Sequence, residues 1–201
     1  MAPTNKDACL SDVGFIMDMS GSVGENWKDE KKFVKRLVKT MNISPRGGHA
    51  AITAFSSHAE LMIKFSDHTT SPGFESAIDA LPYWGGDTRI ESALKVAHDE
   101  MFQKSNGMRS IASKTLVLIT DGQQVGIKYS QWATTFRIAQ IRRIVVGVGN
   151  VSRADLRDLV DFKSDLHIAK SFEELQSADF MRRFSLCDDG KWLDFYFMNS
   201  S

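Results

Sequence analysis

Three separated segments carry oxygen-bearing side chains that could bind a hard cation. They are Asp18-Met19-Ser20-Gly21-Ser22, Gly85-Gly86-Asp87-Thr88 and Thr120-Asp121-Gly122. The first and third each follow a short apolar run, which is typical of a buried strand in a parallel sheet. Because ligands in open α/β sheets gather where the strands end, we expect these side chains to meet. The predicted metal ligands are Asp18, Ser20, Ser22, Thr88 and Asp121.

Two carboxylates and three hydroxyls form an oxygen-only set, which suits Mg²⁺, with Mn²⁺ or Ca²⁺ as alternatives, and does not suit zinc. Alternate positions in an extended loop can direct Asp18, Ser20 and Ser22 to one point, and Gly21 and Gly24 allow the backbone to bend around it. Three neutral hydroxyls would leave the cation incompletely neutralised. At least one coordination position could then accept an anionic group from outside, so the pattern predicts a docking site.

Strand and helix patterns alternate along most of the chain, which predicts an α/β fold with a mostly parallel sheet. A short turn at residues 56–58 indicates that two of the strands form a hairpin. A capping box, Ser171-Phe172-Glu173-Glu174, predicts the start of the last helix, and Ser152 is the expected N-cap of the helix before it. The expected strands are 13–18, 50–55, 61–65, 114–120, 143–148 and 166–169, and the expected helices are 25–42, 73–81, 88–103, 128–140, 152–161 and 171–187.

These patterns divide the chain into a short N-terminal extension (1–10), one domain (11–187) and an aromatic-rich tail (188–201). The tail, which contains Trp192, Phe195, Tyr196 and Phe197, follows a glycine break. We favour a segment that packs on the domain or links it to another part, because chain ends are usually passive unless tied down. A docking segment for another chain is the alternative.

Charge and hydropathy exclude several classes of protein. Lys plus Arg and Asp plus Glu both number 25, so the chain lacks the basic surface of a nucleic-acid binder. No apolar stretch approaches the ~20 residues that span a bilayer. The N-terminus lacks the apolar region of a signal peptide, which leaves a cytosolic protein or a mature segment. Cys9 and Cys187 flank the domain; we favour a disulfide between them, which would indicate an oxidising compartment, over two unrelated buried thiols.

The metal-site segments, together with Val146-Gly147-Val148-Gly149 at a strand end, resemble the von Willebrand factor type A domain family, which includes integrin I domains and the A domains of matrix proteins. The resemblance covers residues 11–187. It implies a doubly wound sheet with one antiparallel edge hairpin and helices on both faces. It also implies a metal-ion-dependent adhesion site in which the serine and threonine hydroxyls ligate Mg²⁺ and the two aspartates act directly or through water.

In this family a carboxylate of the partner usually completes the metal shell. The resemblance therefore implies a secreted or extracellular-matrix protein that binds an acidic residue of a matrix protein, such as collagen, or of a receptor; self-association is possible, and neither nucleic acid nor membrane insertion is expected. Ile90 stands where many members have a second threonine, which affects the outer hydrogen bonds and not the direct ligands. Asp87 could attract a basic partner residue or simply cap a helix. The expected ligand-binding rim is Gly86, Asp87, Glu25 and Gln123.

Two other functions are weighed against an adhesion module. An intracellular scaffold would keep Cys9 and Cys187 as free thiols. A Mg²⁺-dependent enzyme would need a nucleophile beside an acid or base, but Ser20 stands where a second carboxylate would serve and no lysine follows Gly24 to hold phosphates. Gly-x-Ser-x-Gly and Gly-x-Gly-x-x-Gly motifs are also missing. We therefore expect no enzyme activity.

The helix expected at 25–42 is rich in lysine and arginine. Binding of sulfated glycans is conceivable, but we favour a solvated face that Glu25, Asp29 and Glu30 partly balance. The five histidines show no paired metal-ligand spacing. The lysine and arginine residues of the helix expected at 25–42 are Lys28, Lys31, Lys32, Lys35, Arg36 and Lys39.

Overall fold

The computed structural model describes residues 10–122, 124 and 127–186. Cys9, Cys187, Gln123 and the aromatic tail lie outside the described residues, so the expected disulfide and the expected role of the tail stay predictions. Among the described helices, none is long and apolar enough to cross a membrane.

A six-stranded sheet forms the centre of the molecule, with strand order β3-β2-β1-β4-β5-β6. All neighbouring strands are parallel except β2 and β3, which form the antiparallel edge hairpin. This confirms the predicted sheet. The strands are β1 (Ser11–Asp18), β2 (His49–Phe55), β3 (Ala59–Ile63), β4 (Ser113–Thr120), β5 (Ile141–Val148) and β6 (Leu166–Ala169).

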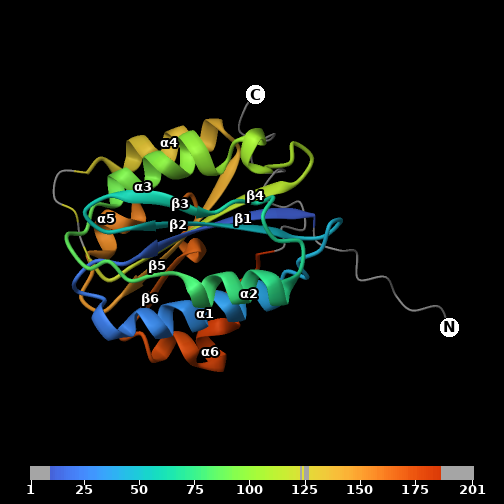
Figure 1. Cartoon of the computed structure of the whole chain (residues 1–201). Coiled ribbons are helices and arrows are strands. Elements are labelled where there is room, and N and C mark those ends of the chain that lie inside the picture. Colours follow the sequence, from blue (N-terminus) through green and yellow to red (C-terminus); the bar gives the residue numbers. More distant parts are fainter. Residues whose placement is uncertain (1–9, 123, 125–126, 187–201) are drawn as a thin grey trace.

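Helices cover both faces of the sheet, as expected (Figure 1). Helices α1 (Trp27–Lys39), α2 (Ser71–Ala80) and α6 (Ala178–Met181) lie on one face, and α3 (Ile90–Val96), α4 (Tyr129–Ile138) and α5 (Arg153–Arg157) on the other. Side chains of the strands alternate between the two hydrophobic cores: Phe15 and Met17 of β1 pack with α1, and Ile16 packs with α3. The short helical turns are Gly24–Asn26, Ala97–Met101 (a π turn), Lys104–Asn106, Lys163–Asp165 and Glu174–Gln176.

The order of the strands changes direction between β1 and β4. From β1 the chain builds β2 and β3 on one side, and β4, β5 and β6 are added on the other. Loops that leave such neighbouring strands diverge and open a crevice at the carboxyl edge of the sheet. The loops after β1 and β4 therefore border this crevice, and they carry Ser20, Ser22 and Asp121.

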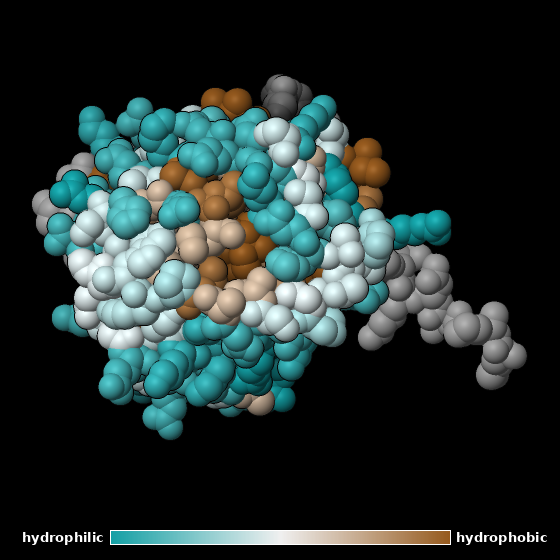
Figure 2. Space-filling model, in the orientation of Figure 1, coloured by the Kyte–Doolittle hydropathy of each residue, from teal (hydrophilic) through white to brown (hydrophobic). Residues whose placement is uncertain are grey.

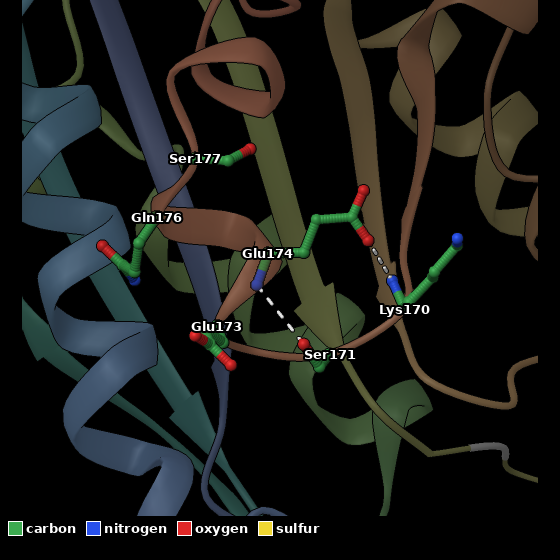
Figure 3. Close-up of a pocket in the computed structure, with 6 residues that line it drawn as sticks. All are labelled: Lys170, Ser171, Glu173, Glu174, Gln176 and Ser177. Atoms are coloured by element: carbon green, nitrogen blue, oxygen red, sulfur yellow. Dashed lines mark hydrogen bonds between the residues drawn. The ribbon is translucent and has the colours of Figure 1, made fainter.

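One predicted helix is wrong. Residues 171–187 do not form a single helix, because a 3₁₀ turn at Glu174–Gln176 ends at Ser177, whose hydroxyl then caps the short α6 by accepting from Phe180 N at 3.1 Å. The capping-box bonds are partly present: Glu174 N donates to Ser171 Oγ at 3.3 Å, and the Glu174 carboxylate accepts from Lys170 N at 2.6 Å (Figure 3). They close a turn around a shallow polar pocket instead of starting a long helix.

The other five expected helices also differ in their limits; 73–81 is observed as Ser71–Ala80 and 128–140 as Tyr129–Ile138, and the remaining three differ as follows. The helix expected at 88–103 begins at Ile90, so Thr88 lies in the preceding loop, and its last turn is the π turn. The α1 helix ends at Lys39, before 42. Ser152 caps α5 as expected, by accepting from Asp155 N at 3.2 Å, but α5 ends at Arg157.

The basic residues of α1 are exposed or half-buried, and several pair with α2. Lys35 Nζ lies 2.6 Å from Asp79 Oδ1, and Lys32 pairs with Asp29 at 2.8 Å. This agrees with a solvated face for the lysines. The prediction that Glu30 belongs to this solvated face is wrong, because Glu30 is fully buried on the opposite side of the helix.

The hairpin leaves β3 as an edge strand. Figure 2 shows hydrophobic surface at the centre of the face on which β3 lies, and the strand contributes Leu61 and Met62, which are only partly buried. The rest of that face is mostly polar.

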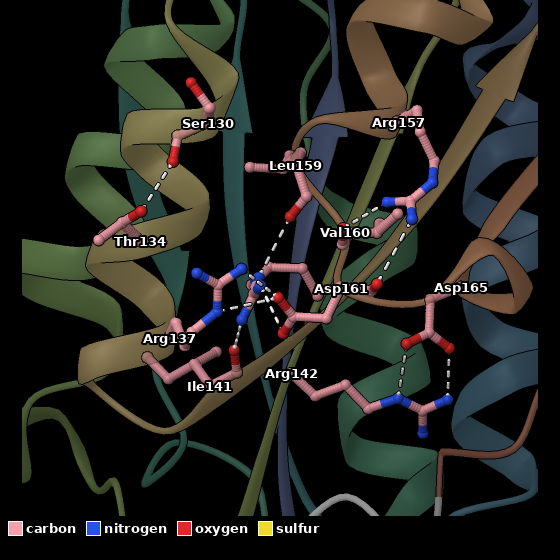
Figure 4. Close-up of polar contacts among 11 residues, drawn as sticks. Ser130, Thr134, Arg137, Ile141, Arg142, Arg157, Leu159, Val160, Asp161 and Asp165 are labelled. Carbon is pink, nitrogen blue, oxygen red and sulfur yellow. Dashed lines mark hydrogen bonds and ion pairs between the residues drawn. The ribbon is translucent and has the colours of Figure 1, made fainter. Parts of the chain in front are cut away.

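A buried ion-pair network fixes β5 to the loop after α5 (Figure 4). Arg143 is 1% exposed, and its Nη2 lies 2.6 Å from Asp161 Oδ2. Asp161 also accepts from Arg137 of α4, at 2.5 Å. Because the guanidinium of Arg143 has no access to water, its charge depends on Asp161 for compensation.

Candidate functional site

Backbone hydrogen bonds hold the loop after β1 against two other loops. Met19 N donates to Phe55 O at 2.7 Å, and Gly21 N donates to Gly86 O at 2.8 Å. Gly86 has a φ of 100°, and a Cβ there would lie 2.6 Å from Ser57 Oγ. Only glycine fits this left-handed position, so the Gly85-Gly86 pair is what allows the two loops to approach.

The sequence-predicted side chains form a continuous chain of hydrogen bonds. Ser20 Oγ and Ser22 Oγ are 3.1 Å apart, and Ser22 Oγ donates to Asp121 Oδ1 at 2.7 Å. Asp18 accepts from Ser20 N through Oδ1 at 2.9 Å. Four of the five predicted ligands are thus brought together by hydrogen bonds where β1 and β4 end.

Thr88, the fifth predicted ligand, lies against Gly122, the residue that follows Asp121. A Cβ on Gly122 would be 2.9 Å from Thr88 Oγ1 and 2.8 Å from Thr88 Cγ2. The residue after Asp121 must therefore be small, because the threonine occupies that space.

Burial raises the pKa values of both aspartates. The Asp18 carboxyl is 0% exposed, and burial raises its pKa to about 6, although hydrogen bonds from Ser20 and Thr120 act against the rise. The pKa of Asp121 is also raised by burial, against its bond from Ser22. Fully buried Glu30 has a pKa well above its usual range, first because of burial and then because of the nearby charge of Asp18.

The arrangement fits a small divalent cation. Oxygens bound about 2.0–2.1 Å from an octahedral Mg²⁺ are about 2.9 Å from their neighbours, and the bonds that join Ser20, Ser22 and Asp121 measure 3.1 and 2.7 Å. Within the described part of the chain, no group of three or more His, Cys, Asp or Glu side chains could hold a metal. A cation at this edge would therefore need the hydroxyls as well as the carboxylates of Asp18 and Asp121.

The expected rim residues that the structure describes lie in the loop before α3, which Gly21 contacts through Gly86, and in the 3₁₀ turn Gly24–Asn26. Gly86, Asp87 and Glu25 are exposed, whereas Gln123 lies outside the described residues. Asp87 does not cap α3: the N-cap is Arg89, and no side chain makes the capping bond. Asp87 N instead donates to Ser57 Oγ at 2.9 Å. Asp87 is exposed, and its attraction of a basic partner residue stays a prediction.

Three further residues shape the site and were not singled out in the sequence. Thr120 Oγ1 donates to Asp18 Oδ2 at 2.7 Å. Tyr83 OH donates to Ser20 O at 2.8 Å and accepts from Gly24 N at 3.1 Å. It therefore bridges two backbone groups of the loop after β1. Glu30 accepts from Asp18 N at 3.0 Å.

These residues gave unequal signals in the sequence. Thr120 stands in a quoted motif, one residue before Asp121, and a hydroxyl at the end of an apolar strand could have been noticed. Glu30 lies three residues after Trp27 and four before Val34, on the apolar face of its helix. Tyr83 has no local signal. It also lines an apolar pocket of about 310 Å³ beside the loop, with Gly24, Glu25, Trp27 and Lys28.

Comparisons with known proteins agree with the fold. The chain is 28% identical over 161 residues to the collagen alpha-1(XII) chain of Notophthalmus viridescens, covering 79% of this chain and 17% of that one. It is 28% identical over 177 residues to integrin alpha-M of Mus musculus, covering 83% and 15%. The chain therefore spans less than a fifth of the length of these two relatives.

A solved structure shows the same fold. Proximal thread matrix protein 1 from the mussel byssus superposes with a TM-score of 0.82 at 23% identity, covering 89% of this chain and 48% of that one. The von Willebrand factor type A domain matches residues 12–181, which is most of the 201-residue sequence. The chain belongs to the von Willebrand factor type A domain family.

Proposed function

We propose that this domain is a divalent-cation-dependent protein-binding module, with the metal held by Asp18, Ser20, Ser22, Thr88 and Asp121. The single observation that carries the proposal is the convergence of hydroxyl and carboxylate oxygens, 2.7 and 3.1 Å apart, where β1 and β4 end. A divalent cation bound there would supply a positive Lewis-acidic centre that attracts a carboxylate. Mg²⁺ is the proposed resident ion, with Mn²⁺ and Ca²⁺ as alternatives.

The carboxylates, the hydroxyls and the residues around them would have different roles in binding. Two carboxylates offset the ionic charge, and the hydroxyls add ligands without adding charge. These five ligands leave one position of an octahedral shell open for a partner's carboxylate. The exposed Asp87 and Glu25 would discourage other anionic surfaces and favour a partner that carries a basic residue near its acidic one. The apolar pocket that Trp27 and Tyr83 line widens the contact surface beside the metal.

The comparisons support an extracellular adhesive role without naming a ligand. Collagen chains, matrilins and an integrin chain are among the relatives. One solved structure of the mussel thread protein has a zinc-occupied metal-ion-dependent adhesion motif by its description. We propose that this chain is secreted or in the matrix, that Cys9 and Cys187 are bridged, and that it has no enzyme activity.

Binding to immobilised collagens tests the proposal. The experiment compares wild type and Asp121→Ala in Mg²⁺ and in EDTA. We expect saturable wild-type binding in Mg²⁺ that EDTA abolishes and that the variant lacks. Equal binding in EDTA would contradict the metal-dependent mechanism, and absence of binding in Mg²⁺ would exclude the collagens tested as the partner.

A further inference from the structure

Glu30 occupies a position where an apolar residue would be expected. It lies on the inward face of α1 with Trp27, Phe33 and Val34, and its side chain is 0% exposed. Burying a carboxyl group without full hydrogen bonding is unfavourable. Its Oε2 has no hydrogen-bond partner among the described residues, so this cost is only partly offset.

The other oxygen, Oε1, accepts from the backbone of Asp18 at 3.0 Å. This N–H needs an acceptor because the pairing of β1 with β4 ends at Ile16 and Leu118, two residues earlier. Successive N–H groups of a strand point to opposite sides, and Met19 N already bonds Phe55 O on the β2 side. Asp18 N therefore points to the β4 side, beyond the last pair of that ladder.

We infer that Glu30 is a positioning residue for the metal site, acting from the core through its hydrogen bond to Asp18 N. The bond from Asp18 N to Glu30 holds the backbone of Asp18 on the side of the hydrophobic core. Thr120 Oγ1 holds the Asp18 carboxylate, to which it donates at 2.7 Å. Asp18 is then held at two points, and the loop that carries Ser20 and Ser22 starts in a defined direction. This inference rests on the proposed metal site.

The inference makes stability and metal binding respond in opposite directions. Glu30→Met removes the acceptor and the buried carboxyl while keeping a side chain of similar length. If Glu30 served only to pack α1, an apolar replacement would leave metal binding unchanged. Glu30→Gln keeps an oxygen at the same distance and removes the acidic group, so it separates the hydrogen bond from the charge.

The test measures Mn²⁺ affinity by calorimetry and metal-free thermal unfolding in EDTA for the wild type and both variants. We expect Glu30→Met to melt at or above the wild-type temperature without metal, because it removes a buried carboxyl group, yet to bind Mn²⁺ about tenfold more weakly, because the backbone of Asp18 is no longer held in place. Glu30→Gln should bind within about threefold of wild type.

Each other outcome has a distinct meaning. Wild-type affinity in Glu30→Met would overturn the positioning role, and a loss in Glu30→Gln as large as in Glu30→Met would overturn the hydrogen bond as its cause. If Glu30→Met fails to fold, Glu30→Leu replaces it in the same comparison, and failure of that variant too would show that Glu30 is required for folding and overturn the inference. Absence of Mn²⁺ binding in the wild type would instead contradict the metal site itself.

Discussion

The hydroxyl of Ser22 donates a 2.7 Å hydrogen bond to Oδ1 of Asp121, 99 residues further along the chain. The two residues lie in loops that leave neighbouring strands at the point where the strand order changes direction. Contact between them therefore depends on the whole sheet and not on local sequence. This explains how a site of small hydroxyls can have defined geometry.

The close approach of Gly122 and Thr88 gives the first prediction. Gly122→Ala should weaken Mn²⁺ binding, because the new Cβ would lie 2.8–2.9 Å from Thr88 and must displace it. Gly122 has no positive φ, so the effect would come from contact and not from backbone strain. We expect the variant to stay folded, at a cost of about 1–3 kcal/mol. Calorimetry with Mn²⁺ measures the binding.

A second substitution tests the cause of that loss. Thr88→Ser removes Cγ2, the nearest atom, and keeps the hydroxyl. In the Gly122→Ala background it should recover part of the affinity. An equal loss with serine and threonine at position 88 would refute steric displacement.

The buried pair between Arg143 and Asp161 gives a prediction about stability. Asp161→Ala should lower the free energy of unfolding by about 3–5 kcal/mol, because it leaves a buried guanidinium uncompensated. Asp79→Ala is the matched control: it breaks the exposed pair with Lys35 and should cost at most about 1 kcal/mol. Urea unfolding measures both. Similar costs for the two variants would show that Arg143 finds other compensation.

The pair can also be replaced instead of broken. Arg143→Met combined with Asp161→Leu should recover most of the stability lost in Asp161→Ala, since no buried charge remains. Mn²⁺ affinity should be unchanged in the double variant, because Arg143 pairs with Leu116 in the first half of β4, whereas the predicted ligands lie where β1 and β4 end.

Burial lowers the pKa of His167 to about 4, against the usual 6.5, with Asp165 acting against the shift and Arg183 and Arg142 adding to it. The unfolded chain then binds more protons than the folded chain between these two pH values. Stability from this group is therefore complete above pH 6.5 and is lost as the pH falls toward 4. At pH 5 the loss should reach at most about 2 kcal/mol.

The measurement compares urea unfolding of wild type and His167→Gln at pH 7 and pH 5. The wild type should lose more stability than the variant over this interval, since only the wild type carries the imidazole. Parallel losses would show that His167 does not contribute to the acid sensitivity.

Much of the fold was predictable because its signals are local. Short apolar runs gave the strands, and the turn at Ser56-Ser57-His58 gave the hairpin, which the structure confirms. The helix predicted from the capping box was wrong because Ser177 starts a new cap six residues later. Two good N-terminal signals within one short segment favour two short turns over one helix.

For the candidate site, the types and order of the residues were predictable from the sequence, but their supporting contacts were not. Asp18, Ser20, Ser22 and Asp121 could be grouped because each follows a strand end. Tyr83 could not be found, because its bonds to Ser20 O and Gly24 N depend on how separate loops pack. Glu30 was assigned to the solvated face because its charge was given more weight than its position in the helical repeat.

Thermal unfolding of wild type and Asp121→Ala in Mg²⁺, Mn²⁺, Ca²⁺ or EDTA tests the metal site most directly. A ligand that binds only the folded state at 100 times its Kd stabilises it by about 2.7 kcal/mol, which is a rise of several degrees in Tm for a domain of this size. We predict such a rise for the wild type in Mg²⁺ or Mn²⁺ and none for Asp121→Ala. Equal melting of the wild type in EDTA and in every cation, or an equal rise in the variant, would contradict the proposed site.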